Sequence, residues 1–206
     1  MKIKLFLISL LFSTLELFSQ GYKKQENESA ENFAMRVLQE QESPNIELHG
    51  KVIETKLWNN PTKIIIAFFK KRILEEEPNY YVDGYVFAEI DKDMYQKILI
   101  DSYYASEALF KIESVFFANA DNDEYHELCV LRSQVLSTDA ESEGTIYNTV
   151  IYDDLVSKQL PTKLLKIESL ENEFESVEGT YDDAPYTKAK YKKASDIKNR
   201  LRELGY

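Results

Sequence analysis

The sequence predicts a mainly β domain of the α+β class. We expect an antiparallel sheet, or a propeller-like or barrel-like arrangement, of about eight strands with an N-terminal and a C-terminal helix. From Ile46 to about Glu175 apolar and polar residues alternate, as they do in strands that are buried on one face. Short polar connections separate these segments, and such connections suit antiparallel hairpins. Before and after this region the apolar spacing becomes helical.

The chain begins with the pattern of a cleavable signal peptide, which we place at residues 1–19. Met1 to Lys4 is cationic, and Leu5 to Phe18 is an apolar run without a cysteine after it. This run has 14 residues, whereas a helix that spans a bilayer needs roughly 20. We therefore expect cleavage between Ser19 and Gln20, no stable membrane anchor, and a periplasmic or secreted protein.

Residues 20–28 are polar and lack periodicity, which predicts a disordered lead before a single domain at residues 29–206. We expect this domain to begin with a helix from about Ala30 to Gln41. Ser29 is a suitable N-cap for that helix. Apolar residues recur on one of its faces at the spacing i, i+3, i+4, i+7, namely Ala30, Phe33, Ala34, Val37 and Leu38.

Eight strands are expected after this helix. The first, Ile46 to Leu57, changes phase near Val52, which predicts a β-bulge. The second, Ile64 to Phe69, is apolar on both faces and is therefore expected at the centre of a sheet. The others are expected near residues 81–90, 98–100, 110–116, 128–136, 146–152 and 164–170.

A second helix is expected at the end of the chain, over residues 190–206. Ser195 or Asp196 is a suitable N-cap. Gly205 stands where a left-handed residue commonly ends a helix. Residues 178–185, which precede this helix, are expected to form a loop.

The composition restricts the classes of partner and reaction. The net charge of −11 disfavours nucleic acid, because a polyanion is repelled. The single cysteine, Cys129, cannot form an internal disulfide and is expected to be a small buried hydrophobic residue. Motifs such as G-x-S-x-G and H-E-x-x-H do not occur. The sequence predicts a protein that is not an enzyme. The alternative is an exported hydrolase with two carboxylates that are distant in sequence.

The segment from Asn119 to Glu127 has the spacing of a calcium-binding loop. Side-chain oxygens stand at alternate positions in Asn119, Asp121 and Asp123, and Glu127 follows where a hydrophobic strand resumes. Calcium takes six to eight oxygen ligands, and oxygens at positions 1, 3 and 5 of a tight loop converge on one point. Tyr125 would supply the backbone carbonyl two residues later. The alternative is an ordinary polar turn, because Asn and Asp are common turn residues.

This segment resembles the calcium loops of the FG-GAP and VCBS repeats, whose pattern is D-x-D-x-D-G-x-x-D/E-L between two strands. The matching residues are Asn119, Asp121, Asp123, Glu127 and Leu128. Asn119 replaces the first carboxylate, and Glu124 stands where a glycine is usual. The resemblance implies a calcium ion that stabilises one hairpin. The stretch from Val115 to Asp154 also resembles segments of exported bacterial proteins. In outline the chain is similar to small periplasmic inhibitors of lysozyme-type enzymes, which are β-rich and acidic and carry one calcium-type loop.

Together these features predict an exported binding or inhibitor-type protein with a calcium site. Its expected partner is a protein or a glycan outside the cytoplasm. The tyrosines of the predicted strands are the expected contact surface, because tyrosine packs well while it keeps a polar end. Aromatic residues are also favoured in strands for packing alone. The tyrosines concerned include Tyr80, Tyr81, Tyr85, Tyr95, Tyr103 and Tyr104.

Overall fold

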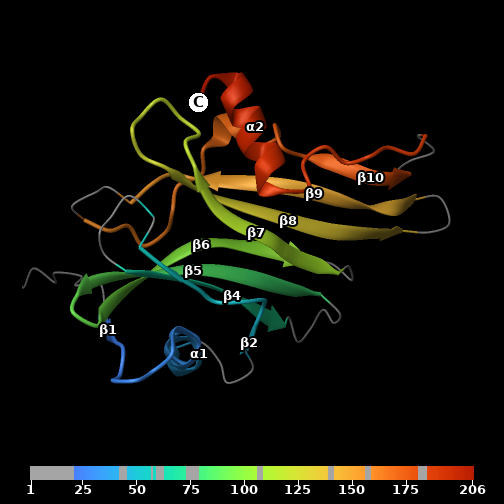
Figure 1. The fold of residues 1–206 in the computed structure, drawn as a ribbon. Helices are drawn as coiled ribbons and strands as arrows, with labels where there is room; N and C mark the ends of the chain where they lie inside the picture. Colours follow the sequence, from blue (N-terminus) through green and yellow to red (C-terminus); the bar gives the residue numbers. More distant parts are fainter. Residues whose placement is uncertain are drawn as a thin grey trace, which may run out of the picture.

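The protein folds into two stacked antiparallel sheets with one helix on each outer face (Figure 1). The predicted mainly β class is confirmed, and the barrel-like alternative applies, because the curled sheets form a half-barrel. The predicted signal peptide lies outside the residues that this computed structural model describes. The described residues are 21–41, 46–56, 58, 63–72, 79–105, 109–138, 142–155, 159–180 and 185–206.

The first sheet has the strand order β1-β6-β5-β4-β2, and β3 also pairs with β4. The strand β4 is central, as predicted for its apolar sequence. Its residues from Ile64 to Phe69 are all buried, because one face of this sheet meets the second sheet and the other meets a helix. The bounds are β1 (Gly21–Lys23), β2 (Ile46–Leu48), β3 (Ile53–Thr55), β4 (Ile64–Arg72), β5 (Tyr80–Asp91) and β6 (Met94–Ala105).

The second sheet has the order β10-β9-β8-β7. Its three long strands follow one another in the chain and pair as hairpins, whereas β10 is a short edge strand beside β9. The bounds are β7 (Phe110–Ala118), β8 (Glu127–Thr138), β9 (Ser142–Tyr152) and β10 (Ser176–Thr180).

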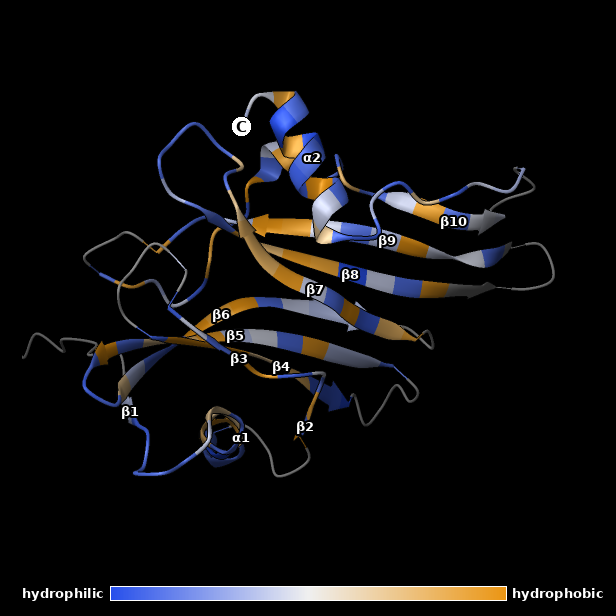
Figure 2. Cartoon of the chain, in the orientation of Figure 1, coloured by the Kyte–Doolittle hydropathy of each residue, from blue (hydrophilic) through white to orange (hydrophobic). Residues whose placement is uncertain are grey.

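Alternation along the strands produces three apolar layers. Figure 2 shows hydrophobic and hydrophilic residues alternating on both sheets. In β4, Ile64, Ile66 and Phe68 belong to the layer between the sheets, which also contains Leu128, Val130 and Tyr152 of the second sheet. The intervening residues Ile65, Ala67 and Phe69 pack against the first helix. The third layer lies between the second sheet and the C-terminal helix.

The helix α1 (Ala30–Gln41) is confirmed as predicted. The Oγ atom of Ser29 accepts a hydrogen bond of 3.1 Å from the N–H of Asn32, so Ser29 caps the helix. The predicted apolar stripe faces the first sheet, with Phe33, Ala34, Val37 and Leu38 buried.

The helix α2 (Ala194–Leu204) begins four residues later than predicted. Ser195 and Asp196 are not its caps, because they lie inside its first turn and the N-cap is Lys193 without a side-chain hydrogen bond. The preceding segment stays extended beside β10, where Thr187 exchanges two backbone hydrogen bonds with Gly179. Gly205 ends the helix with a φ of 98°, as predicted.

Four segments differ, wholly or in part, from their predicted structure. The segment predicted as one bulged strand from Ile46 to Leu57 contains two short strands, β2 and β3, which both pair with β4 in the same direction. The register shifts by two residues between the pairs Leu48↔Phe69 and Ile53↔Ile66, so the predicted irregularity is present at residues 49–52, where Gly50 has a φ of 89°. Residues 164–170 contain only an isolated bridge at Lys166 and then the 3-10 helix η1 (Glu168–Leu170). The strand β10 lies partly in a predicted loop, and β1 lies in the predicted disordered lead.

The segment of residues 160–167 joins one edge of the first sheet to the second. The N–H of Leu99 in β6 donates to the carbonyl of Thr162, and the carbonyl of Leu99 accepts from Leu164, both at 2.9 Å. A few residues later, the N–H of Ile167 donates to the carbonyl of Ile151 in β9 at 3.0 Å. This connection closes one side of the half-barrel.

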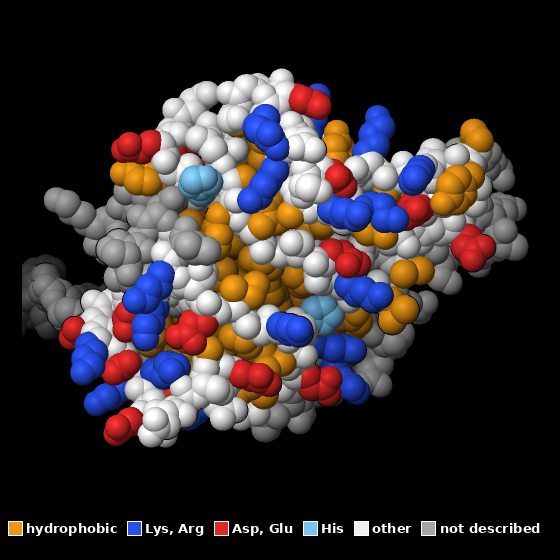
Figure 3. All heavy atoms as spheres, in the orientation of Figure 1, with side chains coloured by type: hydrophobic (Ala, Val, Ile, Leu, Met, Phe, Trp, Pro, Cys, Tyr) orange, Lys and Arg blue, Asp and Glu red, His pale blue; other side chains and the backbone are white. Residues whose placement is uncertain are grey.

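On the opposite side of the half-barrel, ring contacts join the first half of the chain to the edge strand β7, between Trp58 and Phe117 at 5.5 Å and between His49 and Phe110 at 5.8 Å. On this face Figure 3 shows a band of hydrophobic side chains between the two layers, with charged side chains around it. Partly buried hydrophobic residues that pack on the inter-sheet layer include Ile53, Ile112, Val115 and Phe117. In the part of the chain that the structure describes, neither helix has the length and apolar character needed to cross a membrane.

Gly179 of β10 is expected to tolerate no side chain. It has a φ of 132°, and a Cβ atom there would lie 2.2 Å from the carbonyl oxygen of Glu143 in β9. We expect Gly179→Ala to lower the free energy of unfolding in urea by about 2–3 kcal/mol. Gly50→Ala is the matched control, since Gly50 also has a positive φ but nothing lies within 4 Å. In this control variant the free energy of unfolding should fall by about 1 kcal/mol. Equal losses would show that the close approach of the two strands is unimportant.

Candidate functional site

The predicted calcium segment forms the loop between β7 and β8. The two strands pair in antiparallel register until Ala118 lies opposite Glu127. The loop therefore starts at Asn119 and returns beside its own origin. Glu127 is the first residue of β8, on the same face as Cys129 and Leu131, which pack under α2.

Three carboxylates meet in this loop. One oxygen from each of Asp121, Asp123 and Glu127 lies within 4.8 Å of the other two. Glu127 is completely buried, Asp121 is partly buried and Asp123 is exposed. Like charges at this separation disfavour the ionised forms unless a cation lies between them.

Backbone and side-chain hydrogen bonds fix the course of the loop. Asp121 Oδ1 accepts from the N–H of Asp123 at 3.0 Å, and Asp123 Oδ1 accepts from the N–H of Tyr125 at 2.7 Å. Asn119 Nδ2 donates to the carbonyl of Asp123 at 2.8 Å. Glu124, which replaces the usual glycine, is not among the described residues with a positive φ. The missing glycine therefore does not strain this loop.

Two oxygens of the loop are buried without a hydrogen-bond partner among the described residues. They are Oδ1 of Asn119 and Oε1 of Glu127. The other oxygen of Glu127 accepts a hydrogen bond from the N–H of Ala120. A buried acceptor without a partner costs roughly 1–3 kcal/mol, and more if it is charged. Both oxygens are of the type that a hard cation selects.

Burial raises the pKa of Glu127 to about 7. The hydrogen bond from the Ala120 N–H lowers it, whereas the charges of Asp121 and Asp123 raise it further. Without a cation, the Glu127 carboxyl therefore loses its proton only near neutral pH.

The structure thus brings together most of the predicted ligand set. Asp121, Asp123 and Glu127 converge, and Asn119 joins them through its bond to the Asp123 carbonyl. Tyr125 lies at the end of the loop, where its N–H binds Asp123. This set of side-chain oxygens fits calcium, which prefers oxygen ligands in a flexible geometry.

A second polar cluster, which the sequence did not predict, lies between the sheets. Asp101 Oδ2 accepts hydrogen bonds from Lys166 Nζ at 2.6 Å and from the Tyr152 hydroxyl at 3.0 Å. The hydroxyls of Tyr152 and Tyr103 are 2.7 Å apart. Asp101 faces inward because a bulge places Ile100 as an extra residue in β6 opposite the Gly84–Tyr85 step of β5.

Asp101 remains ionised in this cluster. Burial by itself raises its pKa, but hydrogen bonds from Lys166, from the Ser102 N–H and from Tyr152 lower it, and the net pKa lies below the ordinary value of 3.8. Burial also raises the pKa values of Tyr103 and Tyr152. These two hydroxyls therefore stay protonated and donate hydrogen bonds.

We expect the contribution of Asp101 to stability to disappear in acid. Because its folded-state pKa lies below 3.8, ionised Asp101 stabilises the fold above that pH, and the stabilisation is lost as the pH falls through the folded-state value. Asp101→Asn should therefore lower the free energy of urea unfolding at pH 7, and this difference should shrink as the pH falls below 3.8. Lys166→Gln in the same pH series should weaken this dependence. A pH-independent difference between wild type and Asp101→Asn would contradict the assignment.

The hydrolase alternative requires two carboxyls that face one cleft. A general acid in such an enzyme needs a carboxyl with a raised pKa inside a cleft. Among the carboxyls that line the space between the sheets, Asp101 has a lowered pKa. Glu127, whose pKa is raised, lies at the end of the β7–β8 loop on the outer face of β8.

Cys129 is buried, as predicted, and burial raises the pKa of its thiol. The predicted tyrosine surface, in contrast, is largely wrong. Only Tyr81 and Tyr104 among its members are exposed, at 38% and 44%, and their rings contact each other. The buried members, whose rings belong to the apolar layers of the fold, are Tyr80, Tyr85, Tyr95 and Tyr103.

No protein-family model, curated protein or solved structure matches the chain. The resemblance of Asn119 to Leu128 to FG-GAP and VCBS loops therefore rests on the loop itself. That loop has three converging carboxylates and a buried, unpartnered glutamate oxygen.

Proposed function

We propose that the protein is an exported binding or inhibitor-type protein, without catalytic activity, whose β7–β8 loop holds a structural calcium ion. The observation that carries the calcium site is Oε1 of Glu127. It is buried without a partner among the described residues, and its carboxyl lies within 4.8 Å of those of Asp121 and Asp123. A calcium ion would satisfy this oxygen and neutralise the three carboxylates.

The ion would stabilise the fold where the loop meets the third apolar layer. Glu127 begins β8, and the next residues on its face, Cys129 and Leu131, pack under α2 with Ile197 and Leu201. Export is supported by the signal-peptide pattern of residues 1–19. Extracellular calcium modules commonly bind in the millimolar range, which suits a chain exposed to external calcium.

We expect calcium to raise the melting temperature of the protein. A ligand that binds only the folded state adds RT ln(1 + [L]/Kd), which is about 1.4 kcal/mol at a tenfold excess over Kd. For a domain of this size that corresponds to a shift of about 3–6 °C. Thermal unfolding should be followed in EDTA, in millimolar calcium and in millimolar magnesium, since magnesium requires a stricter octahedral geometry.

The double variant Asp121→Asn with Asp123→Asn is the matched control. Asparagine keeps an oxygen that can accept the turn hydrogen bonds from the N–H groups of Asp123 and Tyr125, so the loop should retain its shape and lose its charge. The calcium shift should vanish in this variant. If wild type shows no calcium shift, the loop is an ordinary turn and the calcium part of the proposal fails.

A further inference from the structure

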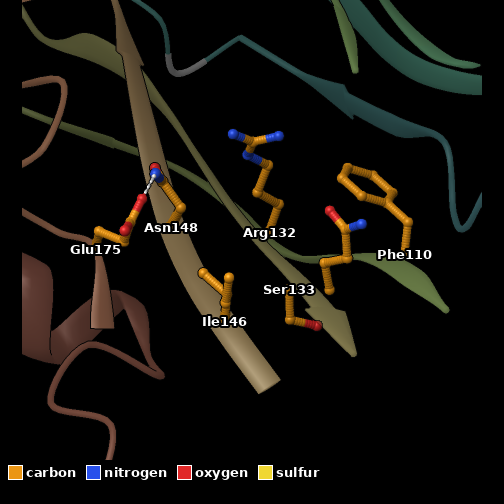
Figure 4. Close-up of a pocket in the computed structure, with 7 residues that line it drawn as sticks. Phe110, Arg132, Ser133, Ile146, Asn148 and Glu175 are labelled. Carbon is orange, nitrogen blue, oxygen red and sulfur yellow. Dashed lines mark hydrogen bonds between the residues drawn. The ribbon is translucent and has the colours of Figure 1, made fainter. Parts of the chain in front are cut away.

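A cleft opens between the two sheets beyond their apolar layer. It has two lobes of about 380 and 150 Å³, and both are lined by Arg132, Asn148 and Glu175. Figure 4 shows the smaller lobe, with Phe110 and Ile146 as its apolar residues. The larger lobe extends to Asp101 and Tyr103 of the polar cluster. Together the lobes have the size of a small-molecule site.

Arg132 supplies a cation without an anionic partner in the described chain. It follows Leu128 and Val130 on the inner face of β8, and its guanidinium lies 5.3 Å from the centroid of the Tyr103 ring. No described residue forms an ion pair or a hydrogen bond with the guanidinium of Arg132, and its Nε atom is buried. A partly desolvated guanidinium favours a carboxylate as its partner, because it can bind the carboxylate through two hydrogen bonds.

Asn148 and Glu175 place acceptors beside this cation. Asn148 lies directly opposite Arg132 in the β8–β9 register, where facing Cβ atoms are about 4.5–5.5 Å apart. Asn148 Nδ2 donates to Glu175 Oε2 at 3.1 Å, whereas Asn148 Oδ1 is buried without a described partner. In Figure 4 the Asn148 amide lies between the Glu175 carboxylate and Arg132. The cleft therefore contains the Arg132 guanidinium, which can bind an anionic group, and nearby oxygens of Asn148 and Glu175, which can bind a cationic group.

The other charged groups of the cleft favour a ligand that carries both charges. Lys166 is already paired with Asp101 at 2.6 Å. Among the described residues that line the cleft, Arg132, Glu171 and Glu175 are then the charged groups without an ion pair. A simple anion would meet these carboxylates and a protein of net charge −11. A simple cation would leave Arg132 unpaired. A zwitterion satisfies both sides without a net charge.

We propose that the cleft binds an α-amino acid or the ends of a short peptide. The carboxylate of the ligand pairs with Arg132, and its ammonium binds Asn148 Oδ1 and the Glu175 carboxylate. An apolar side chain then packs against Phe110 and Ile146. This inference specifies a ligand for the proposed binding role, but it does not depend on the calcium ion, because Arg132 is on the inner face of β8 and Glu127 is on the outer face.

The test is calorimetric titration of the purified protein with four probes. L-Phenylalanine carries both charges, N-acetyl-phenylalanine lacks the ammonium, phenylalanine amide lacks the carboxylate, and glycyl-phenylalanine separates the charges by one residue. The zwitterionic probes should bind at least tenfold more tightly than either blocked probe. Tighter binding of phenylalanine identifies a free amino acid as the ligand type, and tighter binding of the dipeptide identifies a peptide.

Variants locate the binding in the cleft. Arg132→Gln should lower the affinity for the tighter-binding zwitterionic probe at least tenfold. Arg202→Gln, on the exposed face of α2, should leave this affinity unchanged. The probe series in wild type decides the question even if Arg132→Gln does not fold. The inference is overturned if no zwitterionic probe binds at 10 mM (roughly −2.7 kcal/mol), or if N-acetyl-phenylalanine or phenylalanine amide binds equally well. A failed calcium shift would leave these titrations unaffected.

Discussion

Glu127→Gln is expected to stabilise the calcium-free protein and to abolish its response to calcium. The wild-type carboxyl is completely buried beside Asp121 and Asp123. Glutamine keeps an oxygen for the N–H of Ala120 and removes the charge. Since the pKa rises from 4.5 to about 7 on folding, the ionised carboxyl costs up to about 3 kcal/mol above pH 7. The melting temperature in EDTA at pH 8 should therefore rise, and added calcium should no longer change it.

The sign of the pH dependence provides the control. In the calcium-free protein the folded state holds a proton on Glu127 between pH 4.5 and about 7 that the unfolded state has released. The destabilisation by Glu127 therefore grows as the pH rises through this window and is small below it. The advantage of Glu127→Gln should be large at pH 8 and nearly absent at pH 4.5. A variant that is destabilised in EDTA at pH 8 would refute the assignment.

Trp58→Ala is expected to cause the largest loss of stability. Trp58 is 1% exposed, and its ring stacks on Phe117 of β7 at 5.5 Å between centroids. Its Nε1–H donates to the carbonyl of His126 at 2.7 Å, next to Glu127. Truncation of a buried tryptophan costs about 3–5 kcal/mol. We also expect weaker calcium binding, because the anchor of the loop beside its buried carboxylate is lost.

Trp58→Phe separates packing from hydrogen bonding. It keeps an aromatic ring against Phe117 but leaves the His126 carbonyl without this donor, which should cost about 1–3 kcal/mol through the hydrogen bond and the smaller ring. Urea unfolding with and without calcium measures both variants. If the two variants lose the same free energy, the stacked ring contributes little and the hydrogen bond alone fixes the loop.

The elements that could be predicted are those whose structure follows from the local sequence pattern alone. The stripe Phe33, Ala34, Val37 and Leu38 with its Ser29 cap forms α1 with the expected bounds. The centre of β4 was visible because both of its faces are apolar. The hairpins around residues 81–105 and 128–152 follow from alternation and short connections.

Elements that depend on distant partners were not predictable. The strand β1 has three residues and exists through pairing with β6, assisted by a hydrogen bond of 2.8 Å from Arg36 Nη2 to the carbonyl of Lys23. The apolar residues Leu164 and Leu170 suggested a strand, yet each packs into a different apolar layer as the chain passes from one sheet to the other.

The same distinction applies to the sites. The convergence of Asp121, Asp123 and Glu127 was predictable because these residues lie within one short loop of the sequence, from Asn119 to Glu127. The polar cluster was not, because Tyr152 reaches Asp101 across 51 positions and only a bulge turns Asp101 inward. Arg132 and Asn148 likewise become neighbours only through strand register.

The strand order of the two sheets has a consequence for folding. All strands of the first sheet precede residue 106, and all strands of the second follow residue 109. Each half can therefore assemble mainly from neighbouring hairpins, which is typical of rapid early folding. The inner faces, with residues such as Ile66 and Val130, remain uncovered until the halves dock. That docking is the step at which a slowly folding chain is most exposed to aggregation.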